Sequence, residues 1–62
     1  MIDIGKWYKD KTTGCEYFIA YYAYGNDIEL ISKDGDVISK SDNIFDLCND
    51  AGIKLENLCE EK

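Results

Sequence analysis

The chain has 62 residues, with thirteen Asp or Glu, seven Lys, and no His or Pro, and its formal net charge is −6. A chain of this length forms one small domain, residues 1–62, which leaves no room for both a hydrophobic core and a deep substrate cleft. The imidazole base of the usual catalytic triads is also missing. These features exclude most self-contained enzymes, so we expect a protein without catalytic residues.

Residues 1–40 have the pattern of four antiparallel strands joined by short turns. A first strand is expected over residues 2–9, and a turn that contains Gly14 leads to a second over 15–24. Aromatic and β-branched side chains, which favour a pleated strand, fill this second segment. Gly25-Asn26 and Asp34-Gly35 are hairpin signals, and they separate strands expected over residues 27–32 and 36–40.

The pattern changes to helix after residue 40. The first helix is preceded by the good N-cap residues at positions 41–43, and apolar residues then recur at helical spacing from Ile44 to Ala51. Gly52 ends this helix, and Leu55, Leu58 and Cys59 indicate a second short helix over residues 54–61. We therefore expect an α+β fold, with a small antiparallel four-stranded sheet or an open barrel followed by two short C-terminal helices.

Two resemblances follow from these segments. Residues 1–40, a meander with Gly-Asn and Asp-Gly turns, resemble the small barrels of the SH3 type in architecture. Residues 47–58 look like part of a helix-turn-helix, with Gly52 in the turn and Leu58 at an inward position. The second helix of that motif carries Glu rather than Arg or Gln on its outer face, so we interpret the pair as a structural corner and not as a DNA reader.

The three cysteines, Cys15, Cys48 and Cys59, indicate a reducing compartment. Their odd number is unusual for a small secreted domain, and the N-terminus lacks the pattern of a signal peptide. We therefore predict a cytoplasmic protein. Without His or a CxxC pair the cysteines are poor zinc ligands, and Asp34-Gly35 lacks the other ligands of an EF-hand loop. We expect no metal and no other cofactor.

The second strand is aromatic on both of its faces. Alternation places Tyr17 and Tyr21 on one side, with Cys15, Ile19 and Ala23, and places Tyr22 and Tyr24 on the other side, with Glu16, Phe18 and Ala20. Either both faces of the strand are covered by the protein itself, or one aromatic face is left for a partner. Tyrosine suits a partner surface because its ring buries area while its hydroxyl tolerates water.

The excess of negative charge lies entirely in residues 26–62. Asp34 and Asp36 flank Gly35, and Asp42, Asp46 and Asp50 recur every four residues, so the last three share one face of the expected helix. Such a row is either a solvated face or a contact for a basic partner. It repels a nucleic-acid backbone, so we predict neither direct nucleic-acid binding nor a membrane partner.

These features together predict a small acidic protein-binding inhibitor or adaptor whose partner is a protein with a basic, nucleic-acid-binding surface. The short, acidic, tyrosine-rich profile is similar to that of small phage-encoded inhibitors of the anti-CRISPR and anti-restriction groups. The alternatives are a self-associating SH3-like module that forms a homodimer and a small nucleic-acid-binding barrel. The predicted partner-binding residues are Tyr17, Tyr21, Tyr22, Tyr24, Asp34, Asp36, Asp42, Asp46 and Asp50.

Overall fold

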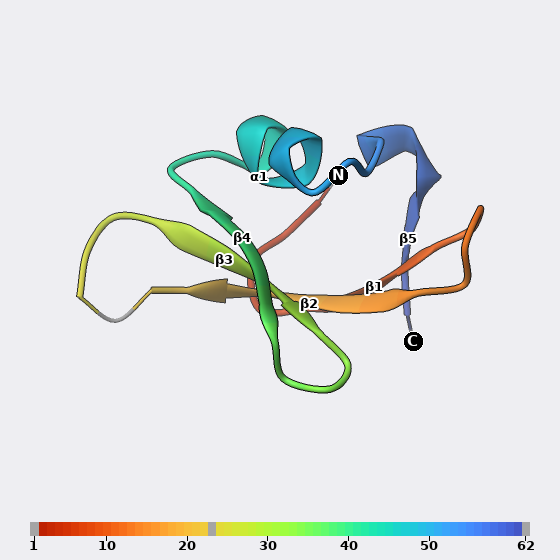
Figure 1. Ribbon diagram of the computed structural model, residues 1–62, viewed down its shortest axis with the longest axis horizontal. Helices are drawn as coiled ribbons and strands as arrows, with labels where there is room; N and C mark the ends of the chain where they lie inside the picture. Colours follow the sequence, from red (N-terminus) through yellow and green to blue (C-terminus); the bar gives the residue numbers. More distant parts are fainter. Residues whose placement is uncertain (1, 23, 62) are drawn as a thin grey trace.

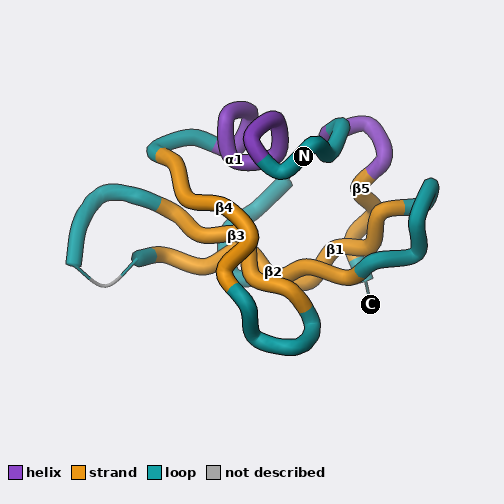
Figure 2. Tube along the Cα trace, viewed as in Figure 1, coloured by secondary structure: helices purple, strands orange, loops and turns teal. Residues whose placement is uncertain are grey.

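The computed structural model describes residues 2–22 and 24–61, in which a five-stranded antiparallel sheet carries one short α-helix (Figures 1 and 2). Ala23, predicted to share a strand face with Tyr17 and Tyr21, lies outside the described residues. The strands are β1 (Trp7–Asp10), β2 (Glu16–Tyr21), β3 (Ile28–Ser32), β4 (Val37–Ser41) and β5 (Leu58–Glu60), and they lie in the order β4-β3-β2-β1-β5. The helix α1 spans Ile44–Asp50, and the 3-10 turn η1 spans Leu55–Asn57.

Short turns connect the first four strands into a meander. Gly14 and Gly35 have φ angles of 79° and 93°, a left-handed conformation that glycine adopts without the steric cost of a side chain. Asp10, which is buried at the end of β1, accepts hydrogen bonds from the backbone N–H and the hydroxyl of Thr12. These two bonds are the main reason why the pKa of Asp10 is lowered, and they hold the β1–β2 turn in shape.

α1 is short but well defined at both ends. The Asn43 side chain accepts a hydrogen bond from the backbone N–H of Asp46, which satisfies one of the free donors of the first turn. Gly52 follows the helix with a φ of 74°, and the N–H of Ile53 returns to the carbonyl of Cys48. A seven-residue helix is unstable alone, so it depends on the sheet against which it packs.

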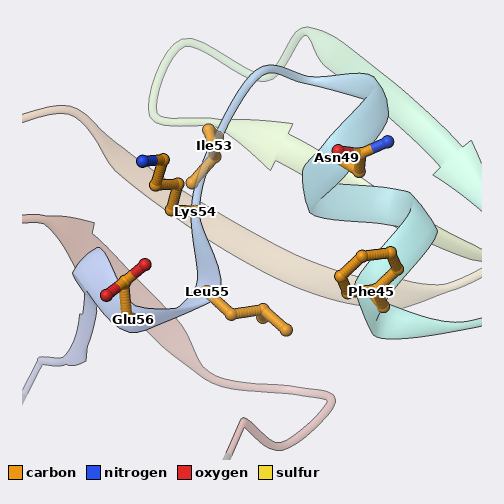
Figure 3. Close-up of a pocket in the computed structure, with 6 residues that line it drawn as sticks. All are labelled: Phe45, Asn49, Ile53, Lys54, Leu55 and Glu56. Atoms are coloured by element: carbon orange, nitrogen blue, oxygen red, sulfur yellow. The ribbon is translucent and has the colours of Figure 1, made fainter.

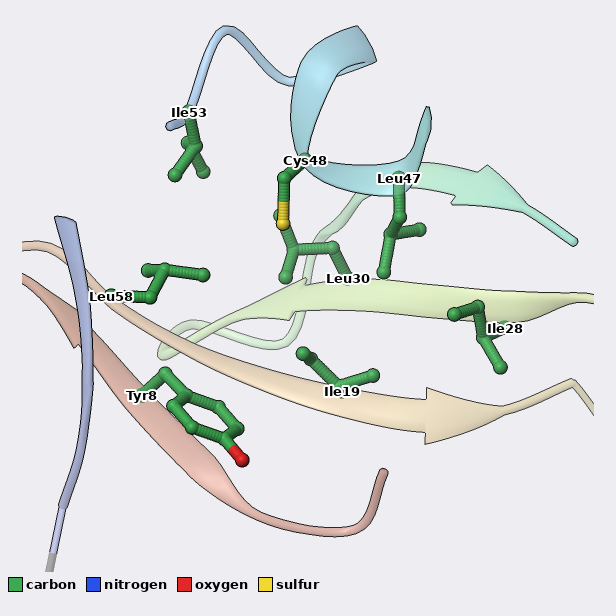
Figure 4. Packing of buried hydrophobic residues seen from close by; sticks show 8 residues of the cluster. All are labelled: Tyr8, Ile19, Ile28, Leu30, Leu47, Cys48, Ile53 and Leu58. Carbon is green, nitrogen blue, oxygen red and sulfur yellow. The ribbon is translucent and has the colours of Figure 1, made fainter. Parts of the chain in front are cut away.

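The hydrophobic core lies between α1 and one face of the sheet (Figure 4). Leu47 and Cys48 project from the helix toward Ile19 of β2 and Leu30 of β3, and all four are almost completely buried. The remaining buried members of the core are Tyr8, Ile28, Ile53 and Leu58. The first residues of the chain also lie on the helix side, where Ile2 and Ile4 pack against this core.

The predicted fold is wrong in the C-terminal region. Residues 54–61, expected as a second helix, instead form η1 and then β5, which adds a fifth strand beside β1. β5 pairs antiparallel with β1, with Leu58 opposite Asp10 and Glu60 opposite Tyr8. The prediction of a four-stranded sheet or SH3-like open barrel with two C-terminal helices is therefore corrected to a five-stranded sheet with one helix. The helix-turn-helix resemblance, which depended on the second helix, is corrected with it. In the part of the chain that the structure describes, no helix has the length and the apolar character that crossing a membrane requires.

Candidate protein-binding surface

The nine predicted partner-binding residues do not form one cluster. β4 runs from the β3–β4 turn, which contains Asp34 and Asp36, to the beginning of α1, which follows Asp42 (Figure 1). A five-residue strand is about 17 Å long, so the acidic residues are divided between the two ends of β4. All five predicted aspartates are exposed, and Asp50 lies at the far end of α1.

The tyrosines are divided as well. Tyr17 is half-buried and packs against the core, and burial, followed by the neighbouring Cys15, raises the pKa of its hydroxyl. Tyr21 and Tyr24 are 74% and 89% exposed at the β2–β3 end of the sheet. β2 spans Glu16–Tyr21, so the bounds expected for this strand, residues 15–24, are wrong.

Tyr22 occupies an intermediate position between these two environments. Its ring meets the ring of Tyr24 edge-on at a centroid distance of 5.9 Å, and Lys40 Nζ lies 3.9 Å from the centre of the Tyr22 ring. Tyr22 is half-buried as a result. It supports Tyr24 and holds Lys40, and it leaves Tyr21 and Tyr24 as the accessible rings.

The beginning of α1 places carboxylates near this tyrosine end. Tyr21 is paired with Ile28 of β3, and Ile28 is paired with Ser41 at the end of β4, directly before Asp42. The Asn43 amide donates to the carboxylates of both Asp42 and Asp46, at 2.8 and 2.9 Å. The two carboxylates are thus held together at the end of the sheet where the exposed tyrosines lie.

The ion pairs of the described residues do not include the five predicted aspartates. Lys6 bridges Asp3 and Glu60 beside β5, and Lys33 pairs with Glu16 at 3.0 Å. Within residues 2–22 and 24–61, none of the five predicted aspartates forms an ion pair. Exposed carboxylates without an ion-pair partner among the described residues therefore lie at the two ends of β4 and along α1.

The outer face of the sheet, which is opposite α1, carries an apolar row that was not predicted from the sequence. Trp7 is paired with Phe18, Phe18 with Ile31, and Ile31 with Val37, so these four side chains form a row across four strands. The Trp7 and Phe18 rings lie 5.4 Å apart, and Trp7 and Val37 remain 38% and 54% exposed. Alternation within each strand could have assigned these residues to one face, but their alignment depends on the register between strands.

A second missed feature is a hollow of about 420 Å³ between α1 and the segment that follows it (Figure 3). Phe45 and Asn49 line it from the helix, and Ile53 and Leu55 line it from the chain beyond Gly52. Phe45 is 64% exposed. The signal was available in the sequence, because Phe45 falls outside the apolar positions that define the buried side of the helix.

Two carboxyl groups share a site at the edge of the outer face. The hydrogen bond from Lys33 is the main reason why the pKa of Glu16 is lowered. Burial, followed by the adjacent Glu16 carboxyl, raises the pKa of Glu61, and Glu61 Oε1 is buried without a hydrogen-bond partner. Burial and the adjacent Glu16 carboxyl both disfavour the charged form of Glu61, which is why its pKa is raised.

The chain matches no known protein-family model, no curated protein and no solved structure. Among the described residues, no three Cys, Asp or Glu side chains lie together in a way that could hold a metal ion. The candidate site is therefore defined by its own geometry, as an acidic and aromatic surface around β4 and the beginning of α1.

Proposed function

We propose that the protein is a small acidic inhibitor or adaptor that binds a protein and covers a basic, nucleic-acid-binding surface of it. The observation that carries this proposal is the set of exposed aspartates, at both ends of β4 and on α1, none of which forms an ion pair with a described lysine. In this proposal the carboxylates occupy positions that phosphates take in the partner's normal ligand. Charge complementarity of this kind speeds association and selects the partner.

The exposed tyrosines supply the second part of the interaction. Tyr21 and Tyr24 lie at the same end of the sheet as Asp42 and Asp46, and tyrosine is enriched among residues that dominate binding energies. We assign the direct contacts to these two rings. Tyr17 and Tyr22 are half-buried, and we assign them a supporting role beneath the surface.

We further propose that the protein acts in the cytoplasm, in the manner of a phage-type anti-defence protein. The cysteines support a reducing compartment, because Cys15, Cys48 and Cys59 are all free and Cys15 and Cys59 are exposed. Proteins that defend a cell against foreign nucleic acid carry basic binding surfaces, which are the chemistry that this acidic surface complements.

The test is capture of basic proteins on the immobilised chain from a bacterial lysate, with the salt concentration varied. We expect nucleic-acid-binding proteins to be retained at low salt, released at high salt, and displaced by added duplex DNA or RNA. The double variant Tyr21→Ala/Tyr24→Ala should bind about tenfold more weakly, whereas Trp7→Ala, which removes an exposed ring of β1 that two strands separate from β4, should bind normally. Capture that is indifferent to salt and to added nucleic acid would contradict the proposal.

A second candidate function is self-association through the outer face of the sheet. The row of Trp7, Phe18, Ile31 and Val37 favours it, because a contiguous apolar row outside the core is a common feature of protein interfaces. Sedimentation at micromolar concentration should then show a dimer that Trp7→Lys converts to a monomer. A strict monomer for the unaltered protein would eliminate this candidate.

A further inference from the structure

We infer that the free edge of β4 accepts an extended segment of the partner as an additional strand, and that this segment carries Lys or Arg at both of its ends. The inference rests on the proposed function and specifies how the basic partner is held. It joins three features of the described residues: an open strand edge, carboxylates at both ends of that edge, and a hollow beside its first residues.

The edge itself is open. β4 is the last strand of the sheet and pairs only with β3 among the described strands. α1 packs on the core side, where the Ser39 hydroxyl donates to the carbonyl of Leu47 at 2.7 Å. Val37 and Ile38 are 54% and 44% exposed. The outward backbone groups of β4 are thus a template for another strand, which is a common mode of peptide recognition.

The charges at the two ends of β4 determine what this strand must be. Asp34 and Asp36 precede its first residue, Asp42 follows its last, and all three are exposed and outside the ion pairs of the described residues. An extended segment laid along β4 therefore has a carboxylate near each end in either direction. Basic residues at both ends of the segment match this arrangement, and acidic ones oppose it.

The same charges argue against a second copy of this chain on the edge. Antiparallel pairing of two β4 strands would place Asp36 of one copy beside Asp42 of the other. Parallel pairing would place each aspartate beside its own equivalent. Both arrangements bring like charges together, a device by which natural sheets prevent edge-to-edge association. A basic segment from another protein relieves the repulsion that a second copy creates.

Specificity within the segment comes from a hollow beside the beginning of β4. It has a volume of about 460 Å³, and Ile38, Tyr17 and Cys15 form part of its wall together with Asp34. Ile38 lies at the bulge in the β3–β4 register, since Leu30 is paired with Ser39 and Ile31 with Val37. Ile38 and Tyr17 line the same hollow, so an apolar side chain of the added strand has a place to enter.

The opposite edge of the sheet lacks these features. β5 has only three residues, and the ion pair between Lys6 and Glu60 lies beside it. Short edge strands discourage strand addition, and β5 offers fewer backbone groups than the five residues of β4. The geometry therefore favours β4 alone as the docking edge.

The experiment uses the full chain and a fluorescein-labelled peptide of alternating Val and Thr with two Lys at each end. We expect saturable binding by fluorescence anisotropy, with amide chemical-shift changes concentrated in residues 37–41. Two altered peptides are the ligand controls: one has Glu in place of Lys, and the other is N-methylated on the amides of one strand edge. Both should bind at least about tenfold more weakly, because one loses the charge match and the other loses the backbone hydrogen bonds.

Two matched variants distinguish the effect of the charges beside β4 on binding from the effect of the net charge. The triple variant Asp34→Asn/Asp36→Asn/Asp42→Asn should weaken peptide binding by about tenfold. The variant Asp3→Asn/Glu56→Gln/Glu60→Gln removes the same charge from residues outside β4 and the turns that flank it, and should change binding by less than about twofold. Circular dichroism and the spectrum of the free protein establish that both variants are folded.

Three outcomes would overturn the inference: equal weakening by the two triple variants, undiminished binding of the N-methylated peptide, or shift changes away from β4. Absence of peptide binding would overturn it as well. If the immobilised chain still captured basic proteins in a salt-dependent way, the proposed function would stand and only strand addition would fail. If neither occurred, both would fail.

Discussion

Glu61 is the residue whose ionisation most directly opposes the folded structure. Its pKa is raised above 4.5, first by burial and then by Glu16, so the folded protein retains a proton that the unfolded chain releases near that value. The corresponding stabilisation is complete below the unfolded pKa and is lost as the pH rises through the folded pKa. We therefore expect Glu61→Gln, which imitates the protonated acid, to be more stable than the unaltered protein at about pH 7 and equally stable at about pH 4.

The substitution Glu16→Gln should change the free energy of unfolding in the opposite direction. The hydrogen bond from Lys33 lowers the pKa of Glu16, so its contribution to stability is present above the unfolded value and is lost as the pH falls. The substitution should destabilise the protein at neutral pH and have less effect in acid. Urea unfolding of both variants across this range measures the difference, and a Glu61→Gln effect independent of pH would contradict the raised pKa of Glu61.

At the scale of elements, α1 carries an acidic residue at its C-terminal end, where the helix dipole disfavours negative charge. Asp50 is the last residue of the helix, near the negative end of its dipole, and it lies four residues after Asp46. We expect Asp50→Lys to stabilise the protein by about 1 kcal/mol, because it replaces a like-charge pair with an attractive one and complements the dipole. Thermal unfolding followed by circular dichroism measures this effect.

The same substitution tests whether Asp50 serves binding rather than folding. Capture of basic proteins on the immobilised chain should decrease while stability increases. Lys54→Gln, an exposed position beyond the helix, is the control and should leave both quantities nearly unchanged. A variant that is more stable and binds as well as before would show that Asp50 has no part in the interaction surface.

β5 shows why sequence reasoning identified some elements and not others. Strong local signals, such as Asp34-Gly35 in a turn and Asn43 at a helix N-cap, correspond to a turn and a helix in the structure. The spacing of Leu55 and Leu58 is compatible both with a helix and with η1 followed by a strand. What decides between them is pairing of residues 58–60 with β1, some fifty residues earlier in the chain, and no local pattern contains that contact.

The sequence likewise predicted some features of the candidate surface and not others. The alternation in residues 16–21 correctly separated the side of Tyr17 and Ile19 from the side of Phe18, because side-chain direction is a local property of a strand. Which tyrosines remain exposed depends instead on where α1 covers the sheet and where β2 ends. The grouping of the aspartates depends on the position of β4 at the edge, which is a property of the topology.

At the scale of the whole molecule, the separation of charge links stability to the proposed function. The lysines that form ion pairs bind Asp3, Glu60 and Glu16, so the aspartates around β4 have no ion-pair partner among the described residues. Repulsion between like charges destabilises the compact state, and salt screens it. A surface optimised only for stability would distribute its lysines among these aspartates.

The variant Asp34→Asn/Asp36→Asn/Asp42→Asn measures this cost directly, because it halves the net charge of −6 without removing apolar side chains. We expect its free energy of unfolding to exceed that of the unaltered protein by about 0.5 kcal/mol at low salt. The difference should vanish at high salt, where the Debye length falls to about 3 Å. A difference that persisted at high salt would place its origin in local backbone conformation, since screening removes the repulsion between exposed charges but leaves turn geometry unchanged.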